Sequence, residues 1–112
     1  MTNDRNRLPQ LDGGLYLTDG GIETTLIFHE GFDLPDFAAF HLLQTAEGTA
    51  ALQKYFRTYA GLATRLSTGL VLESATWRSN PDWGTRLGYT AAMLADANLS
   101  AIQLLEEIEQ EY

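Results

Sequence analysis

A long stretch with helical periodicity, followed almost at once by a short apolar run, constrains the fold of this chain most strongly. From Thr45 to Leu66, apolar residues recur at spacings of three and four, and Thr45 is a suitable N-cap residue. Residues 69–74 then form a short apolar run bounded by polar segments, which is typical of a buried strand. The two segments predict a helix that leads directly into a strand.

A similar pattern lies on either side of this pair. Residues 14–18 form a short, mostly apolar run that ends at the turn signal Asp19-Gly20-Gly21. From about Thr90, a second helical period carries Leu94, Ala97, Ala101, Leu105 and Ile108 on one face. The order strand, helix, strand, helix predicts a parallel sheet with helical crossovers.

The remaining segment, residues 22–40, is apolar but interrupted by Gly31 and Pro35, so we expect a loop with a short helix near 36–43. Two parallel strands cannot cover both of their faces, and a closed (β/α)8 barrel needs about 250 residues. At 112 residues, the chain is predicted to be one incomplete α/β unit without an internal domain boundary.

Charge and composition exclude several classes of function. Seven Lys and Arg residues against 15 Asp and Glu give a net charge of -8, which disfavours nucleic acids and anionic membrane surfaces as partners. No apolar run approaches the roughly 20 residues that span a bilayer, and residues 1–10 are polar, so we expect a cytoplasmic protein. The absence of cysteine excludes a thiol nucleophile or thiolate metal ligands within this sequence.

The first candidate for a functional site comes directly after the first predicted strand. A carboxylate and two glycines, Asp19-Gly20-Gly21, lie where ligands bind at the carboxyl end of parallel strands. Glycines let backbone amides approach a ligand, and Asp19 can accept hydrogen bonds from an amine or from loop amides. The alternative is that Asp19-Gly20 is only a turn, because this pair is among the commonest in turns.

The second candidate comes after the second predicted strand. Glu73, Ser74, Thr76 and Trp77, with Arg78 after them, are expected on the same face as Asp19. The alternatives are that Glu73 is a buried partner of Arg78 or Arg86, and that Trp77 and Trp83 serve only in packing. His29 and His41 have no neighbouring ligand pattern, so we predict surface or packing roles and no metal site.

Three motifs of the chain resemble the homocysteine S-methyltransferase family. The run 17–26, LTDGGIETTL, is similar to that family's first-strand motif, although Glu23 replaces the usual glycine. The segment 31–35 is similar to the stretch directly after that motif in the family, and 72–80, LESATWRSN, to the second-strand motif. There Thr76 and Asn80 are kept, Trp77 replaces a tyrosine, and Glu73 and Ser74 depart from the pattern.

The resemblance implies a fold and an activity. It implies the N-terminal fragment of a (β/α)8 TIM barrel, its first two βα units, with residues 1–112 a homocysteine-binding domain truncated at its C-terminal end. The expected reaction transfers a methyl group from a small-molecule donor to the thiol of homocysteine, forming methionine. Asp19, Gly20, Gly21, Thr76 and Trp77 would bind substrate, and none of them is expected to be catalytic.

A zinc ion that activates the thiol is implied for the full-length family barrel, but this chain offers no cysteine to bind it. Enzymatic activity of the chain by itself therefore stays open. Two other hypotheses compete with a truncated methyltransferase. One is a non-catalytic fragment completed by a partner chain, and the other is a metal-free barrel enzyme that uses Asp19 and Glu73 as acid and base.

Overall fold

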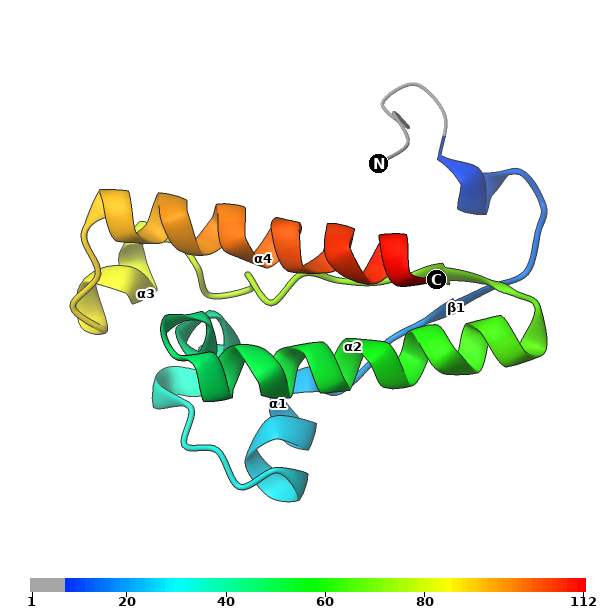
Figure 1. The fold of residues 1–112 in the computed structure, drawn as a ribbon. Helices are drawn as coiled ribbons and strands as arrows, with labels where there is room; N and C mark the ends of the chain where they lie inside the picture. Colours follow the sequence, from blue (N-terminus) through cyan, green and yellow to red (C-terminus); the bar gives the residue numbers. More distant parts are fainter. Residues whose placement is uncertain (1–7) are drawn as a thin grey trace.

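The computed structural model describes residues 8–112; the first seven residues of the polar lead-in lie outside this range. Two long helices and two short strands form its frame (Figure 1). The elements, in chain order, are η1 (Pro9–Leu11), β1 (Tyr16–Thr18), α1 (Ile22–Thr24), η2 (Thr25–His29), η3 (Pro35–Phe37), η4 (Ala39–Gln44), α2 (Ala46–Leu66), β2 (Gly69–Val71), α3 (Pro81–Arg86) and α4 (Ala91–Glu111).

Helix α2 begins and ends where the sequence predicts. The hydroxyl of Thr45 accepts a hydrogen bond of 2.9 Å from the backbone N–H of Gly48, which satisfies one of the free donors of the first turn. At the other end, Ser67 adopts a left-handed conformation with φ of 53° and terminates the helix. Strand β2 then starts two residues later.

Helix α4 is also confirmed: it begins at Ala91, next to the predicted start near Thr90, and Thr90 is its N-cap. The Thr90 hydroxyl accepts from the backbone N–H of Met93 at 3.1 Å. Helices α2 and α4 lie side by side and run in the same direction, opposite to the strands (Figure 1). Arg57 of α2 forms two hydrogen bonds, 2.9 and 2.7 Å long, with the carboxylate of Glu111 near the end of α4.

The sheet consists of two parallel strands, as the element order predicts. Tyr16 pairs with Gly69, Leu17 with Leu70 and Thr18 with Val71. Each strand has only three residues, although the sequence predicted runs of five and six. The pairing stops after Val71 because the backbone N–H of Glu73 donates to the side chain of Asp19, not to the backbone of β1.

The predicted fold class, the first two βα units of a (β/α)8 barrel, is wrong. Helical residues make up 65% of the described chain, and its sheet has only the strands β1 and β2. None of the six strand residues is fully buried. The molecule is a small, mainly helical domain, in which helix packing and not a barrel sheet forms the core.

Much of the additional helix comes from residues 22–44, where only one short helix was expected. The chain there forms the short helical turns α1, η2, η3 and η4, of which η4 packs against α2 and α4. Leu26 and Phe40 from this segment are completely buried. Several apolar residues of this stretch therefore belong to the core, although Phe28 and Phe37 are exposed, and the glycine and proline divide the stretch into short turns.

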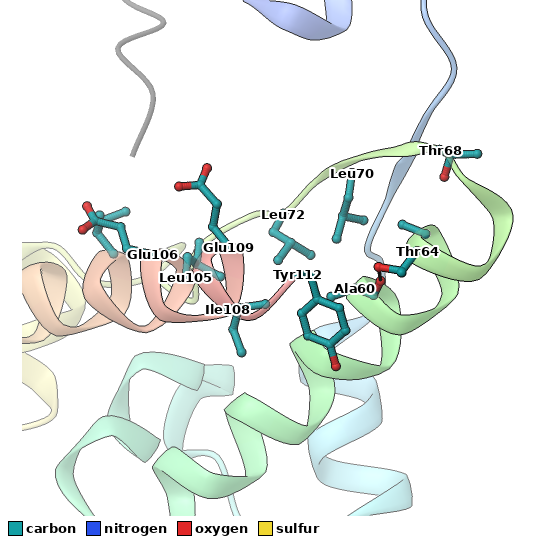
Figure 2. A pocket seen from close by; sticks show the side chains of 12 residues that line it. Ala60, Thr64, Thr68, Leu70, Leu72, Leu105, Glu106, Ile108, Glu109 and Tyr112 are labelled. Carbon is teal, nitrogen blue, oxygen red and sulfur yellow. Dashed lines mark hydrogen bonds between the residues drawn. The ribbon is translucent and has the colours of Figure 1, made fainter.

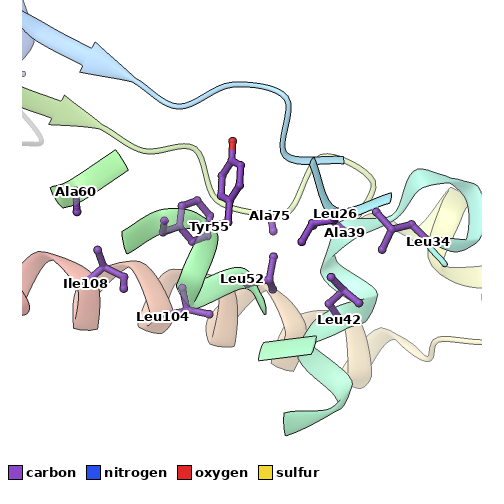
Figure 3. Packing of buried hydrophobic residues seen from close by; sticks show 11 residues of the cluster. Leu26, Leu34, Ala39, Leu42, Leu52, Tyr55, Ala60, Ala75, Leu104 and Ile108 are labelled. Atoms are coloured by element: carbon purple, nitrogen blue, oxygen red, sulfur yellow. The ribbon is translucent and has the colours of Figure 1, made fainter. Parts of the chain in front are cut away.

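The main core lies between this segment, α2 and the end of α4 (Figure 3). Leu52 and Phe56 of α2 meet Leu104 and Ile108 of α4 there. A smaller cluster joins η4 to the beginning of α4 through Phe40, Tyr89 and Leu94. Together these clusters hold the two long helices in place and leave the carboxyl ends of both strands open.

The short helix α3 was not predicted, since residues 78–82 look like a polar connection. Its N-cap is Asn80, whose side-chain oxygen accepts from the backbone N–H of Trp83 at 3.2 Å, and Pro81 occupies the first helical position. Gly84 packs against Leu94, so this helix is held against α4. Helix α3 thereby carries Trp83 back toward the segment after β2.

Candidate functional site

A pocket of about 230 Å³ opens where β1 and β2 end. Its walls come from the segments directly after the two strands. The lining residues are Asp19, Gly20, Gly21, Ile22, Glu23, Glu73, Ser74 and Trp77. This is the position in which parallel strands commonly present ligand-binding groups.

Asp19 joins the two sides of the pocket. One carboxylate oxygen, Oδ1, accepts from the backbone N–H of Glu73 at 2.9 Å, and the other, Oδ2, accepts from the hydroxyl of Tyr55 at 2.9 Å. These bonds link the end of β1 to the segment after β2 and to helix α2. Asp19 is therefore more than a turn residue: it fixes the shape of the pocket.

Two tyrosines of α2 support the loop that forms one wall. The hydroxyls of Tyr55 and Tyr59 lie 2.9 and 3.0 Å from the carbonyl oxygen of Gly20. Figure 3 shows the Tyr55 hydroxyl directed out of the apolar cluster. Burial and the hydrogen bond to the Asp19 carboxylate raise the pKa of Tyr55 well above its ordinary value, so the phenol keeps its proton as a donor.

Gly21 allows the chain to turn sharply out of the strand. It has φ of 68°, in the left-handed region that favours glycine, and it is the N-cap of α1. A side chain at this position would be strained even though there is free space around it. Asp19-Gly20-Gly21 is thus both a turn and a wall of the pocket, so the two interpretations offered by the sequence do not exclude each other.

Two carboxylates of the pocket have no cationic partner among the described residues. Glu23 is half-buried and Glu73 is exposed, and neither forms an ion pair or a side-chain hydrogen bond within the described part of the chain. Glu73 does not pair with Arg86, which binds Asp36 at 3.4 Å instead. The hypothesis of Glu73 as a buried ion-pair partner is therefore wrong, and the pocket has an acidic lining.

Of the five predicted substrate-binding residues, the structure brings together four. Asp19, Gly20, Gly21 and Trp77 line the pocket, whereas Thr76 is not among its lining residues and pairs with Ser74 through hydroxyls 2.7 Å apart. The sequence did not single out Tyr55 or Glu23. Tyr55 had a usable signal, since a tyrosine on the buried face of a helix needs a partner for its hydroxyl.

Trp77 is not a packing residue, because 61% of its surface is exposed. The guanidinium carbon of Arg78 lies 4.1 Å from the centroid of Trp77 and 3.8 Å from that of Trp83. Arg86 stacks on Trp83 as well, at 4.9 Å. The indole rings and guanidinium groups form a layered cluster at the edge of the pocket.

Neither histidine contributes to the pocket. His29 is exposed, and His41 contacts Tyr89, whose hydroxyl is 2.7 Å from Nδ1. Within residues 8–112, no group of three or more His, Asp or Glu side chains is arranged to hold a metal ion. The residues present therefore do not fit the zinc ion that the family resemblance implies.

A second, apolar pocket of about 400 Å³ lies between α2, β2 and α4 (Figure 2). Leu70 and Leu72 form one side, Ile108 and Tyr112 another, and Glu106 and Glu109 lie at its rim. It contains none of the predicted site residues. The hypothesis of a fragment completed by a partner chain stays a prediction, which size-exclusion chromatography can test.

In the described part of the chain, no helix has the length and apolar character needed to cross a bilayer. No protein-family model, no curated protein and no solved structure matches this chain. The resemblance to homocysteine S-methyltransferases therefore rests on the motif residues alone.

Proposed function

We propose that this chain binds the amino-acid end of homocysteine in the pocket between the ends of β1 and β2, as the acceptor-binding part of a methyltransferase. The observation that carries the proposal is the pair of unpartnered carboxylates, Glu23 and Glu73, which line the same small pocket in the described part of the chain. The motif resemblance supplies the choice of homocysteine among amino acids.

The pocket offers a suitable environment for an ammonium group. Two carboxylates without partners among the described residues attract a cation, and a charge-assisted hydrogen bond to either is stronger than a neutral one. Asp19 already accepts hydrogen bonds at both oxygens, so its part is to hold the pocket walls together. The exposed ring of Trp77 provides apolar surface for the aliphatic part of the ligand.

Binding and orientation are the parts of methyl transfer that we propose for these residues. Holding an acceptor in a fixed direction removes much of the entropic cost of a two-substrate reaction. Because the residues present do not fit a zinc ion, we derive no step of thiol activation from them.

The bonds of Asp19 disfavour its use as an acid or base. General acid–base catalysis requires a side chain that is within reach of the substrate proton and able to exchange its own. Both oxygens of Asp19 instead accept from protein donors at 2.9 Å. A positioning role fits this geometry better than proton transfer.

Isothermal titration calorimetry with L-homocysteine tests the proposal directly. We expect Glu73→Gln and Glu23→Gln each to weaken binding about tenfold, the loss typical of a charge-assisted hydrogen bond. Glu107→Gln, an equal charge change at an exposed position of α4, is the control and should leave the affinity unchanged. Absence of binding to the unaltered chain, or equal affinities for all variants, would contradict the proposal.

A further inference from the structure

Arg78 is a cation beside the pocket. It has no carboxylate partner in the described part of the fold. Lys54, Arg57 and Arg86 each form an ion pair in residues 8–112, with Glu30, Glu111 and Asp36 respectively. Arg78 forms none there and contacts the two indole rings instead. Within the described chain, its charge is therefore balanced only by the π-faces of Trp77 and Trp83.

The polar edge of this guanidinium is incompletely satisfied. Nε of Arg78 is buried and has no hydrogen-bond partner among the described residues, and the neighbouring Ser79 Oγ is in the same state. Guanidinium groups that stack on aromatic rings use their faces for that contact and keep their N–H edges for planar acceptors. An acceptor is thus expected for Arg78 that the described chain does not provide.

Arg78 is next to the pocket that contains the unpartnered glutamates. Trp77, on which it stacks, belongs to the pocket wall together with Glu23 and Glu73. Glu73 and Arg78 are only five residues apart and carry opposite charges, yet they do not form an ion pair. Arg78 does not itself line the pocket, but its contact with Trp77 places an unneutralised cation beside the two unneutralised carboxylates. Neighbouring charges of both signs match a ligand that itself carries both.

We propose that Arg78, held between Trp77 and Trp83, binds the carboxylate of the amino-acid ligand whose ammonium group is bound by Glu23 and Glu73. This inference rests on the proposed function and deepens it: Arg78 determines specificity for an amino acid over the corresponding amine. Planar, two-point hydrogen bonding to a carboxylate is the recognition for which the guanidinium group is suited.

Calorimetric titration with two ligands separates the inference from the proposed function. L-homocysteine carries the carboxylate, and 3-aminopropane-1-thiol is the same molecule without it. We expect the unaltered chain to bind homocysteine at least about tenfold more tightly than the amine, since a site built for a charged hydrogen-bonding group discriminates strongly against its loss. Arg78→Gln should remove this preference and leave the affinity for the amine within about twofold.

Two further variants serve as controls. Arg65→Gln makes the same charge change at an exposed residue near the C-terminal end of α2. It should preserve the preference for homocysteine. Arg78→Lys keeps the positive charge but lacks the planar group, so it should retain only part of the preference for homocysteine over the amine. If Arg78→Gln does not fold, Arg78→Lys decides, since an undiminished preference for homocysteine in that variant would overturn the role of Arg78.

The outcomes are distinct. Binding of both ligands with equal affinity, or a preference that survives in Arg78→Gln, would overturn the role of Arg78 and leave the proposed function standing. Failure of the unaltered chain to bind either ligand would overturn both. A preference lost in Arg78→Gln and kept in Arg65→Gln would support the inference.

Discussion

The hydroxyl of Tyr55 donates a 2.9 Å hydrogen bond to Oδ2 of Asp19, which connects the middle of helix α2 to the end of strand β1. The same carboxylate accepts from the backbone of Glu73 through its other oxygen. One side chain thus joins a helix and both strand ends. The position of the pocket depends on this connection more than on the short sheet.

Replacement of Tyr55 by phenylalanine should destabilise the fold more than the same change at Tyr59. Tyr55→Phe leaves the half-buried carboxylate of Asp19 without one donor, and we expect a loss of about 1–3 kcal/mol in the free energy of unfolding. Tyr59→Phe removes only an exposed bond to the Gly20 carbonyl and should cost less than about 1 kcal/mol. Urea denaturation measures both, and equal losses would contradict a special role for the Asp19 bond.

The long helices were predictable because their signals are local. The period of three and four identifies most of the buried faces of α2 and α4, although Leu66 is exposed and Leu104 is buried where Leu105 was predicted. Thr45 and Thr90 cap these helices through side chains that bond within their own first turns. The parallel arrangement of the strands was predictable too, since a helix separates them. The helices depend on residues that are near each other in the sequence, and the direction of the strands follows from the order of the elements.

The extent of the sheet and the fold class were not predictable in this way. In the sequence, residues 72–74 continue the run predicted as a strand. In the structure the chain leaves the sheet there, because the backbone N–H of Glu73 donates to the side chain of Asp19, 54 residues earlier. Similarly, Leu26 lies in a predicted loop and Phe40 in a predicted short helix, and the burial of both depends on packing against distant helices. Local patterns could identify Asp19 and Trp77 as candidates, but not the layering of Arg78 between two indoles.

Alkaline pH should destabilise the protein through Tyr55. Burial and the neighbouring Asp19 carboxylate raise the pKa of this phenol above its ordinary value of 10.0 in the folded state. Above pH of about 10, the unfolded chain releases a proton that the folded chain retains, so stability falls as the pH rises. Burial also raises the pKa of Tyr89, which adds to the effect.

Thermal unfolding measured between pH of about 8 and about 11 tests this expectation. The melting temperature should stay level up to about pH 10 and then decrease. In Tyr55→Phe, the decrease should be smaller, although its starting stability is lower. An identical alkaline decrease in Tyr55→Phe and the unaltered protein would show that other groups are responsible.

The N-cap of α2 contributes to stability independently of the pocket. Thr45→Ala removes the acceptor for the Gly48 N–H, and we expect a loss of about 1 kcal/mol. Thr49→Ala, one turn later, is the matched control, because alanine has the higher helix propensity and this hydroxyl caps nothing. Chemical denaturation of both variants should therefore give changes of opposite sign or clearly different size.

Gly48 and Gly61 offer a paired test of close packing within the same helix. A Cβ atom at Gly48 would collide with the backbone of Leu42, including its carbonyl oxygen, and a backbone group cannot rotate away as a side chain can. At Gly61, a Cβ would meet no atom within 4 Å. The two positions thus differ in space but share the helical backbone.

We expect Gly61→Ala to stabilise the protein by up to about 1 kcal/mol, because alanine loses less backbone entropy in a helix than glycine. Gly48→Ala has the same benefit, but it must push η4 away from α2, which costs about 1–3 kcal/mol or more. Its net effect should be destabilising, and urea denaturation gives the sign directly. Stabilisation by both substitutions would mean that η4 does not pack against the first turn of α2 as closely as described, and the small core around Phe40 would lose its anchor to that helix.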